Sequence, residues 1–415
     1  MNRFTKIWKG LGPGLMYAAA AIGVSHLVQS SRAGGLYGFE LVWVVLLIHL
    51  VKYPFFLIGP LFAAHTNKSL IQAYAQMGKG YLGFYIVLTL TTVFTIQAAV
   101  TLVTAAILAS WLPFDWSPAF IGVALLFAGA LFLWKGRYYL LDKLVKWVVL
   151  SLTLATLAAL GLAFFQLPAW PEVSEGNAFQ WERRDWIFLI ALMGWMPAPL
   201  DIAVWQSVWT LEKKRLLPKF DLKAVKRDYE IGFWGTCFLA LVFLSLGALV
   251  LFPKGMTLDM SSTAFISVFI QIYTETLGGY AYHFMMLAAV LTMLSTSLTT
   301  LDAGPRILGE ALALWGNKGK TAATKIYRMG VWVLASGTAI ILLFFTASLT
   351  QMVDLATILS FITTPFLAFL SWKAINSQYL SPELKPGKWF QIWAISGIVL
   401  LLAFALGFLY IRFMV

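Results

Sequence analysis

The sequence is poor in the residues that build most enzyme and metal sites. It holds a single cysteine, Cys237, and only four histidines among 415 residues. One thiol excludes a disulfide framework and a cysteine-based metal site. No HExxH pair, nucleophile elbow or clustered His/Asp set occurs along the chain, which argues against an enzyme. We therefore expect no catalytic residues and no resident cofactor.

Charge is also scarce, at 12% of the residues, and acidic residues are fewer than basic ones, 18 against 30. Hydrophobic residues make up 60% of the chain, and the mean hydropathy is +0.81. These values are typical of an all-α polytopic membrane protein. We see no soluble domain and treat residues 1–415 as one transmembrane domain that works as a monomer.

Long hydrophobic runs are abundant. A membrane span needs ~20 apolar residues, and this rule predicts eleven helices, at about 12–37, 40–63, 82–110, 117–135, 147–166, 186–211, 231–252, 281–309, 328–347, 350–372 and 389–411. With a cytoplasmic N-terminus, 24 of the 30 lysines and arginines lie inside, four lie outside and two fall within spans. This asymmetry follows the positive-inside rule. It predicts a multi-pass protein of the cell inner (plasma) membrane with its C-terminus outside, and it argues against nucleic-acid binding despite the net charge of +12.

The first predicted span is interrupted at its middle. Its apolar run meets a glycine, a β-branched residue and two polar side chains in succession: Gly23, Val24, Ser25 and His26. Non-helical backbone at mid-bilayer depth is tolerated only where it is buried in protein or lines a wet cavity. We interpret this stretch as one half of a substrate site.

The sixth predicted span, 186–211, is interrupted in the same way by Gly194, Pro197 and Pro199. Proline removes a hydrogen-bond donor and clashes with the preceding turn, so the helix should unwind here. A simple proline kink is the alternative. Five helices in each half, with the break in the first of each, indicate an inverted-repeat transporter. The repeats would cover about 12–166 and 186–372, followed by an extra helix at 389–411.

Several motifs carry a family resemblance. They are Gly12-Pro13, Gly34-Gly35, Tyr37-Gly38-Phe39 and Leu41-Val42-Trp43 around the first span, Met196-Pro197 with Leu200 in the sixth, and STSLTTLDAG in the eighth. On these residues the chain resembles the NRAMP divalent-metal transporters, which have a LeuT-like fold. The resemblance implies a substrate site between the first and sixth spans and transport by alternating access.

The chain departs from that family at the metal site. The resemblance places the metal-binding aspartate on Gly23, the asparagine on His26 and a second-break histidine on Ala198. The third span carries Gln97 where family members have proton-handling acids. Of the implied metal ligands, only the thioether of Met196 remains.

Without a carboxylate, the dehydration of a divalent ion would be poorly compensated. Half-helix N-termini, Ser25 and a donor His26 would suit an anion instead. Arg32 lies six residues further, ~9 Å along a helix, and would draw anions into the outer mouth. Related branches that lack the aspartate include proteins associated with bicarbonate transport, so the resemblance implies bicarbonate as the substrate.

Other interpretations of these residues remain open. His26 and Met196 can be packing residues, and Arg32 can be a snorkelling side chain at a helix end. A transporter of divalent metal (Mn²⁺, Fe²⁺ or Mg²⁺) with unusual ligands and proton coupling is the second hypothesis. A receptor that binds solute without moving it is the third.

For coupling, Thr296, Thr299 and Thr300 share one face of the eighth span. In LeuT-like folds a comparable hydroxyl pair faces carbonyls at the first-helix break, here around Ile22, and binds sodium. We expect sodium coupling, with proton coupling through His26 as the rival and back-bonded threonines as the structural alternative. Asp201 is a candidate gate. Together with Lys52, Asp302 and Asp354, it should pair within this group or face water.

Overall fold

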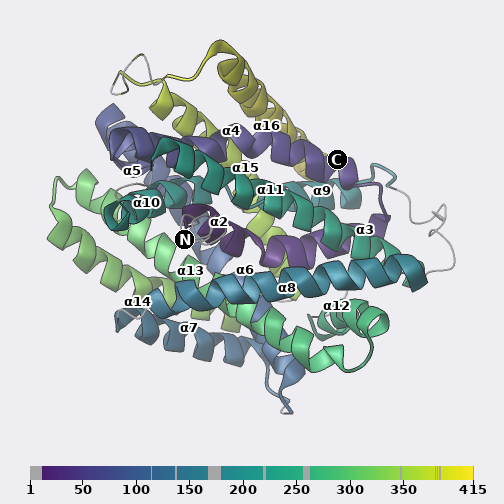
Figure 1. Cartoon of the computed structure of the whole chain (residues 1–415). Coiled ribbons are helices and arrows are strands. Elements are labelled where there is room, and N and C mark those ends of the chain that lie inside the picture. Colours follow the sequence, from purple (N-terminus) through teal and green to yellow (C-terminus); the bar gives the residue numbers. More distant parts are fainter. Residues whose placement is uncertain are drawn as a thin grey trace, which may run out of the picture.

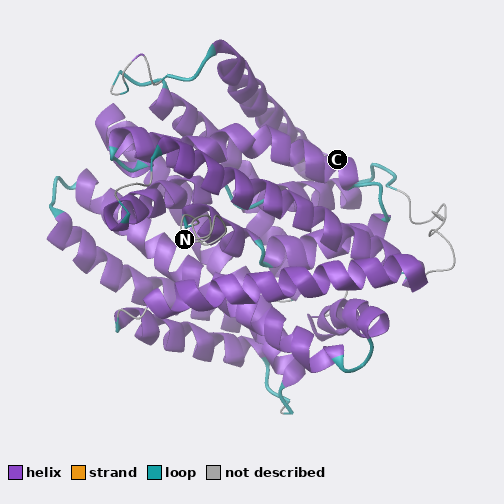
Figure 2. Cartoon of the chain, viewed as in Figure 1, coloured by secondary structure: helices purple, strands orange, loops and turns teal. Residues whose placement is uncertain are grey.

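The structure is a computed structural model that describes residues 12–113, 115–135, 138–166, 179–217, 221–255, 262–345, 348–378, 380, 382 and 385–414. Within these residues the chain is helical and contains no β-strand, as Figure 2 shows. The all-α fold predicted from the sequence is confirmed. Residues 167–178, which follow the fifth predicted span, lie outside the described residues.

Nine of the predicted spans are continuous helices. They are α4 (Val42–Thr66), α6 (Lys79–Trp111), α7 (Pro118–Trp134), α8 (Tyr138–Gln166), α11 (Leu222–Leu246, extended by η2, Gly247–Leu251), α13 (Ala281–Trp315), α14 (Lys320–Phe344), α15 (Leu349–Ile375) and α16 (Lys388–Met414). Three short elements were not predicted: α5 (Leu70–Met77), α12 (Ser262–Leu277) and η3 (Phe252–Lys254).

The first and sixth spans are broken. The first consists of α2 (Pro13–Ala21), η1 (Val24–Ser30) and α3 (Ser31–Tyr37), and the sixth consists of α9 (Arg183–Trp195) and α10 (Asp201–Leu216). Seven helices in the described residues are long and apolar enough to cross a membrane alone. The broken spans are not among them, because each of their halves is shorter than a bilayer requires.

The broken spans lie inside the bundle. In Figure 1, α2 is at the centre of the view, whereas α16 and α7 lie at opposite edges. Helix α2 contacts α11 and α13, α9 contacts α15, and α10 contacts α4. Helix α14 covers α13 and α7, and α16 packs on α4, α9 and α15. The interrupted backbone is therefore surrounded by protein rather than lipid, as a bilayer demands.

Small residues allow the first span to approach its neighbours closely. A Cβ atom on Gly34 would lie 1.9 Å from the main-chain oxygen of Leu244, and one on Gly247 would lie 2.3 Å from that of Ser31. Only glycine fits at either position, which is the usual way that helices in membranes bring their backbones together. This contact fixes α3 against η2.

Candidate functional site

The break in the first span follows directly from its sequence. Helix α2 ends at Ala21, Gly23 takes dihedral angles that are neither helical nor extended (φ −131°, ψ −126°), and the chain resumes as a π-helix from Val24 to Ser30. The wide π turn displaces side chains from their α-helical positions, and such turns are frequent at functional sites. The predicted interruption at Gly23–His26 is confirmed.

The polar side chains of this break bind main-chain oxygens. His26 is fully buried; its Nδ1 lies 2.8 Å from the Ala21 carbonyl oxygen and its Nε2 lies 2.9 Å from that of Thr236. Ser25 Oγ donates to the Ala21 carbonyl and lies 3.4 Å from the Pro197 carbonyl. His26 thus ties the end of α2 to α11, and Ser25 links the first break to the second.

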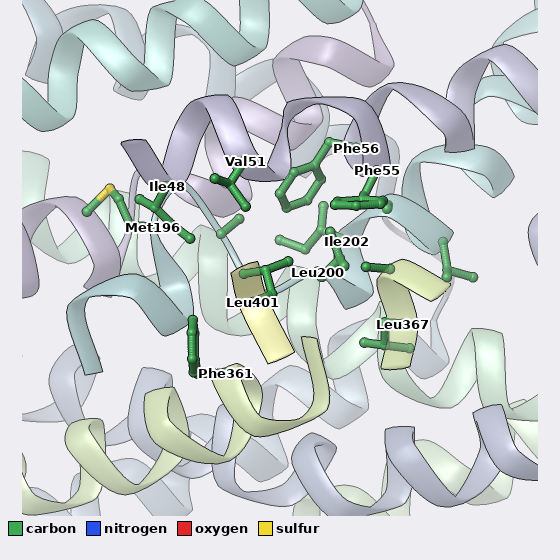
Figure 3. Close-up of a cluster of buried hydrophobic side chains, with 14 of the residues drawn as sticks. Ile48, Val51, Phe55, Phe56, Met196, Leu200, Ile202, Phe361, Leu367 and Leu401 are labelled. Carbon is green, nitrogen blue, oxygen red and sulfur yellow. The ribbon is translucent and has the colours of Figure 1, made fainter. Parts of the chain in front are cut away.

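The break in the sixth span runs from Met196 to Leu200, between α9 and α10. A Cβ on Gly194 would lie 2.0 Å from the Thr357 oxygen, so the end of α9 is pressed against α15. Met196 and Ala198 have no exposed surface. Figure 3 places Met196 beside Ile48 in the buried apolar cluster. Its thioether is therefore packed among aliphatic side chains.

A lysine lies at the end of α9. Lys52, on α4, is fully buried, and its Nζ donates to the carbonyl oxygens of Met193 and Gly194, both at 2.8 Å. A third oxygen, that of Ala198, is 3.4 Å away. Carbonyls in the last turn of a helix have no intrahelical partner and form its negative end. The Lys52 side chain caps that end with the hydrogen-bond donors of its Nζ.

The sequence pointed to Lys52 only as an ionisable residue within a span. Its partners lie more than 140 positions further along the chain, and no local motif links α4 to α9. An intramembrane lysine is a functional hypothesis by default, and that was the one available signal.

Asp201 occupies the opposite side of the same break. It is the first residue of α10 and is 3% exposed. Within the described part of the chain, neither of its carboxylate oxygens has a hydrogen-bond partner. Lys52 attracts it electrostatically, yet no ion pair within 4.0 Å joins the two. The negative side chain lies at the positive end of α10, which stabilises both.

Arg32 is not a free cation at the outer mouth. It is buried and forms two hydrogen bonds with Asp354 on α15, at 2.7 and 3.2 Å. It also donates to Gln29, and its guanidinium lies over the Phe188 ring at 5.2 Å from the ring centroid. The structure therefore places Arg32 in an ion pair that joins α3 to α15.

Asp302 is also paired locally, with Arg306 at 2.7 Å and with the Tyr327 hydroxyl at 2.6 Å. Among the residues described, no ion pair joins any two of Lys52, Asp201, Asp302 and Asp354. Three of them find partners outside this group, and Asp201 has none among the described residues. Asp354 is also partly exposed, which agrees with the alternative that such residues face water.

The three threonines of α13 separate into different environments. Thr296 Oγ1 lies 3.3 Å from the Ala19 carbonyl of α2, and a Cβ on Gly23 would lie 3.0 Å from the same side chain. Thr300 instead donates to Gln97 of α6 at 2.7 Å. Thr299 is buried. Thr296 therefore faces the first span, as the sequence suggested, whereas Thr300 faces α6.

The comparisons with known proteins agree with this architecture. A model of the natural resistance-associated macrophage protein-like (Nramp) family matches residues 14–411. An uncharacterized protein of Pasteurella multocida is 32% identical over 363 residues, covering 87% of this chain and 83% of its own length.

Two kinds of solved structure are similar. A mutant of the Eremococcus coleocola manganese transporter aligns with 98% of this chain and 87% of its own, at a TM-score of 0.69 and 14% identity. A nucleobase-cation-symport-1 family transporter, in a closed conformation with bromovinylhydantoin bound, covers 96% and 91% at a TM-score of 0.57 and 14% identity. At these identities the structures establish a shared, LeuT-like fold.

Two broken helices that meet inside a helical membrane bundle are the arrangement that many membrane transporters use. The chain belongs to the Nramp family, and the protein is a membrane transporter. Within the described residues, no group of three or more His, Cys, Asp or Glu side chains is placed to hold a metal ion.

Proposed function

We propose that this transporter carries a small inorganic anion, with bicarbonate as the best fit, and couples its movement to sodium. The substrate would bind between the two breaks, at Gly23–His26 of the first span and Gly194–Ala198 of the sixth. Alternating access would then expose this site to one side of the membrane at a time. The similar manganese transporter shares the fold, and the proposal rests on the residues of this chain.

The single observation that carries the proposal is the Lys52 ammonium at the second break. It already occupies the carbonyl oxygens of Met193 and Gly194, which are the oxygens that a cation between the breaks would need. At an effective dielectric constant of about 20, a divalent cation ~5 Å from an ammonium is repelled by roughly 7 kcal/mol, and a monovalent anion is attracted by roughly 3 kcal/mol. That repulsion corresponds to about a 10⁵-fold loss of affinity.

The first break adds no compensating charge. Gly23 supplies no side chain, and Ser25 and His26 are both buried beside carbonyl oxygens. Bicarbonate both donates and accepts hydrogen bonds, so it can use carbonyls, a hydroxyl and an imidazole together. A divalent metal needs several negative or strongly polar oxygen ligands, and Met196 is a soft thioether within an apolar cluster.

Sodium is the proposed coupling ion because hydroxyl and carbonyl oxygens suit it. Thr296 with the Ala19 carbonyl is one such oxygen pair beside the first break. A sodium ion and a bicarbonate ion that bind together have no net charge. This lowers the free energy of placing both in a low-dielectric site.

Purified protein in liposomes tests the function directly. A pH-sensitive dye in the lumen should report bicarbonate flux down an imposed gradient, and replacing external sodium by choline should slow it. A Mn²⁺-quenched dye in parallel liposomes should show no more uptake than protein-free liposomes do. Robust Mn²⁺ uptake with no bicarbonate flux would reject the proposal.

A further inference from the structure

An open groove lies on the outer surface of the bundle, between the end of α7 and the first half of α14. Its volume is about 870 Å³, which is within the size range of small-molecule sites. Figure 1 shows these two helices together at one edge of the bundle. Only 33% of the most apolar stretch of α14 is buried, against 78% in α13. This edge therefore faces the bilayer.

The chemistry of the groove changes along α14. The residues of α14 that line it come in neighbouring pairs every four positions, so they share one face of the helix. A phospholipid has a charged head group followed by apolar acyl chains, and this face has a basic part followed by an apolar part. The basic residues are Lys320, Lys325 and Arg328, and the apolar ones are Met329, Trp332 and Val333.

The length of α14 places its basic part at the depth of the lipid head groups. Its 25 residues span roughly 38 Å, whereas the hydrocarbon core of a bilayer is ~30 Å thick. The other end of the helix, at Phe344, is apolar and exposed, so the excess of about five residues belongs at the Lys320 end. Lys325 and Arg328 can reach the same layer by snorkelling. Trp134 of α7, 54% exposed, fits the aromatic belt found at this depth.

The positive charge of this end is not compensated by acidic side chains. Helix α14 contains no acidic residue, and its N-cap, Gly319, supplies no side-chain hydrogen bond. Among the described residues, no ion pair within 4.0 Å involves Lys320, Lys325 or Arg328. Basic residues at the positive end of a helix are unfavourable, and an anion there is favourable. An anionic ligand would compensate both the helix end and the side chains.

Aromatic contacts hold one of these cations at the groove. The Arg328 guanidinium lies over the Trp134 ring, 5.7 Å from its centroid, which is a cation–π contact. The Trp134 ring in turn lies 6.2 Å from that of Trp332. Lys320 also lines the neighbouring vestibule that contains Glu310, so Lys325 and Arg328 are the cations that belong to the groove alone.

We propose that the α7–α14 groove binds one anionic phospholipid, with its phosphate beside Lys325 and Arg328 and its acyl chains along Met329 and Val333. Basic pockets between membrane helices bind anionic head groups in this way. No residue that lines the groove belongs to the broken spans. The inference is therefore independent of which solute the transporter carries.

The test titrates the full-length protein in detergent with phosphatidylglycerol and, in parallel, with phosphatidylcholine of the same acyl chains. The midpoint of thermal unfolding is measured, because a ligand that binds only the folded state raises it with concentration. We expect a larger rise with phosphatidylglycerol in the wild type. The double variant Lys325→Gln/Arg328→Gln should weaken the apparent affinity for phosphatidylglycerol about 30-fold and leave the response to phosphatidylcholine unchanged.

Lys223→Gln/Arg227→Gln is the matched control, because it removes the same two charges from exposed positions in the first two turns of α11. It should keep the full response to phosphatidylglycerol. The inference is overturned if the α14 variant responds as the wild type does, if the control loses as much, or if phosphatidylcholine stabilises the wild type equally well. It is also overturned if inorganic phosphate alone gives the rise that depends on Lys325 and Arg328, since the ligand would then be a free anion.

Discussion

The two breaks of this transporter solve the same structural problem with different chemistry. At the first break, the Ser25 hydroxyl and the His26 imidazole contact main-chain carbonyl oxygens. At the second break, a lysine caps the end of α9 and an aspartate begins α10. Both breaks are buried and closed, but only the second carries fixed charge.

This difference indicates which break selects the charge of the substrate. The first break can accept a substrate of either charge, because carbonyl oxygens and hydrogen-bond donors are both present there. The second break differs, because the Lys52 Nζ already donates to the free carbonyl oxygens at the end of α9. The Asp201 carboxylate oxygens have no hydrogen-bond partner among the described residues. On the proposed function, the Lys52 side chain is what favours an anion over a cation between the breaks.

The largest expected effect comes from removing the charge at the second break. Lys52→Met leaves the Met193 and Gly194 carbonyls buried without this donor. Each of the two should lower the free energy of unfolding by about 1–3 kcal/mol. Anion flux should be abolished. Chemical unfolding of the detergent-solubilised protein measures the first effect, and liposome flux measures the second.

Lys214→Met provides the matched control for Lys52→Met. Lys214 also donates to a main-chain oxygen, that of Ala64 at 2.6 Å, and to the Asn67 side chain at 2.7 Å. It is only partly buried, near the end of α10, so water can replace it. The control should cost less than about 1 kcal/mol. Equal losses in the two variants would show that burial at the break is not what makes Lys52 important.

A carboxylate introduced at the first break would give it a charged side chain, as the second break already has. Gly23→Asp buries a carboxylate whose Cβ lies 3.0 Å from the Thr296 side chain, and we expect a loss of about 2–4 kcal/mol in the free energy of unfolding. Gly23→Asn has nearly the same shape without the charge and should lose about 1–2 kcal/mol less. A carboxylate tolerated as well as the amide would mean that the first break is not electrostatically neutral.

His26→Gln weakens the neutral bridge between α2 and α11. One of the two carbonyl contacts, to Ala21 or to Thr236, should be lost, at about 1–3 kcal/mol, with slower anion flux. His49→Gln is the control, since the Nδ1 of His49 contacts only the Val45 oxygen within its own helix. If the two substitutions have the same effect on flux, His26 acts only as a packing residue.

The smallest expected effect belongs to Thr296→Val. It removes one weak hydrogen bond, 3.3 Å long, to the Ala19 oxygen, and the hydroxyl also bonds within its own helix at 3.1 Å. A loss of about 0.5–1 kcal/mol is expected. If Thr296→Val lowered the free energy of unfolding as much as Lys52→Met does, the first break would matter as much as the second for stability, contrary to our expectation.

The breaks themselves were predictable because their cause is local. Gly23 beside Val24, and Gly194 with Pro197 and Pro199, interrupt long apolar runs, and helix propensity alone predicts that the helices end there. The π-helix after Gly23 was not predicted, because nothing in the composition of Val24–Ser30 distinguishes it from an ordinary turn of helix. The order of the spans could be read from hydropathy in the same local way.

The charges were only partly predictable, because their partners are set by packing between distant helices. Arg32 and Asp354 are separated by 322 positions, and Lys52 binds main-chain oxygens, which every residue possesses. Sequence reasoning therefore identified Lys52, Arg32 and Asp201 as ionisable residues within spans, yet it placed Arg32 in an open mouth and left Lys52 without a role. Only the structure distinguishes a compensated arginine from a carboxylate with no partner.

The most direct test of the account is an experimental density map of the protein prepared with Mn²⁺ and recorded with anomalous scattering at the manganese edge. The account predicts no anomalous peak between the breaks, with the Lys52 ammonium remaining on the Met193 and Gly194 oxygens. A manganese peak within bonding distance of Met196 and the Met193 oxygen, with Lys52 displaced, would contradict it.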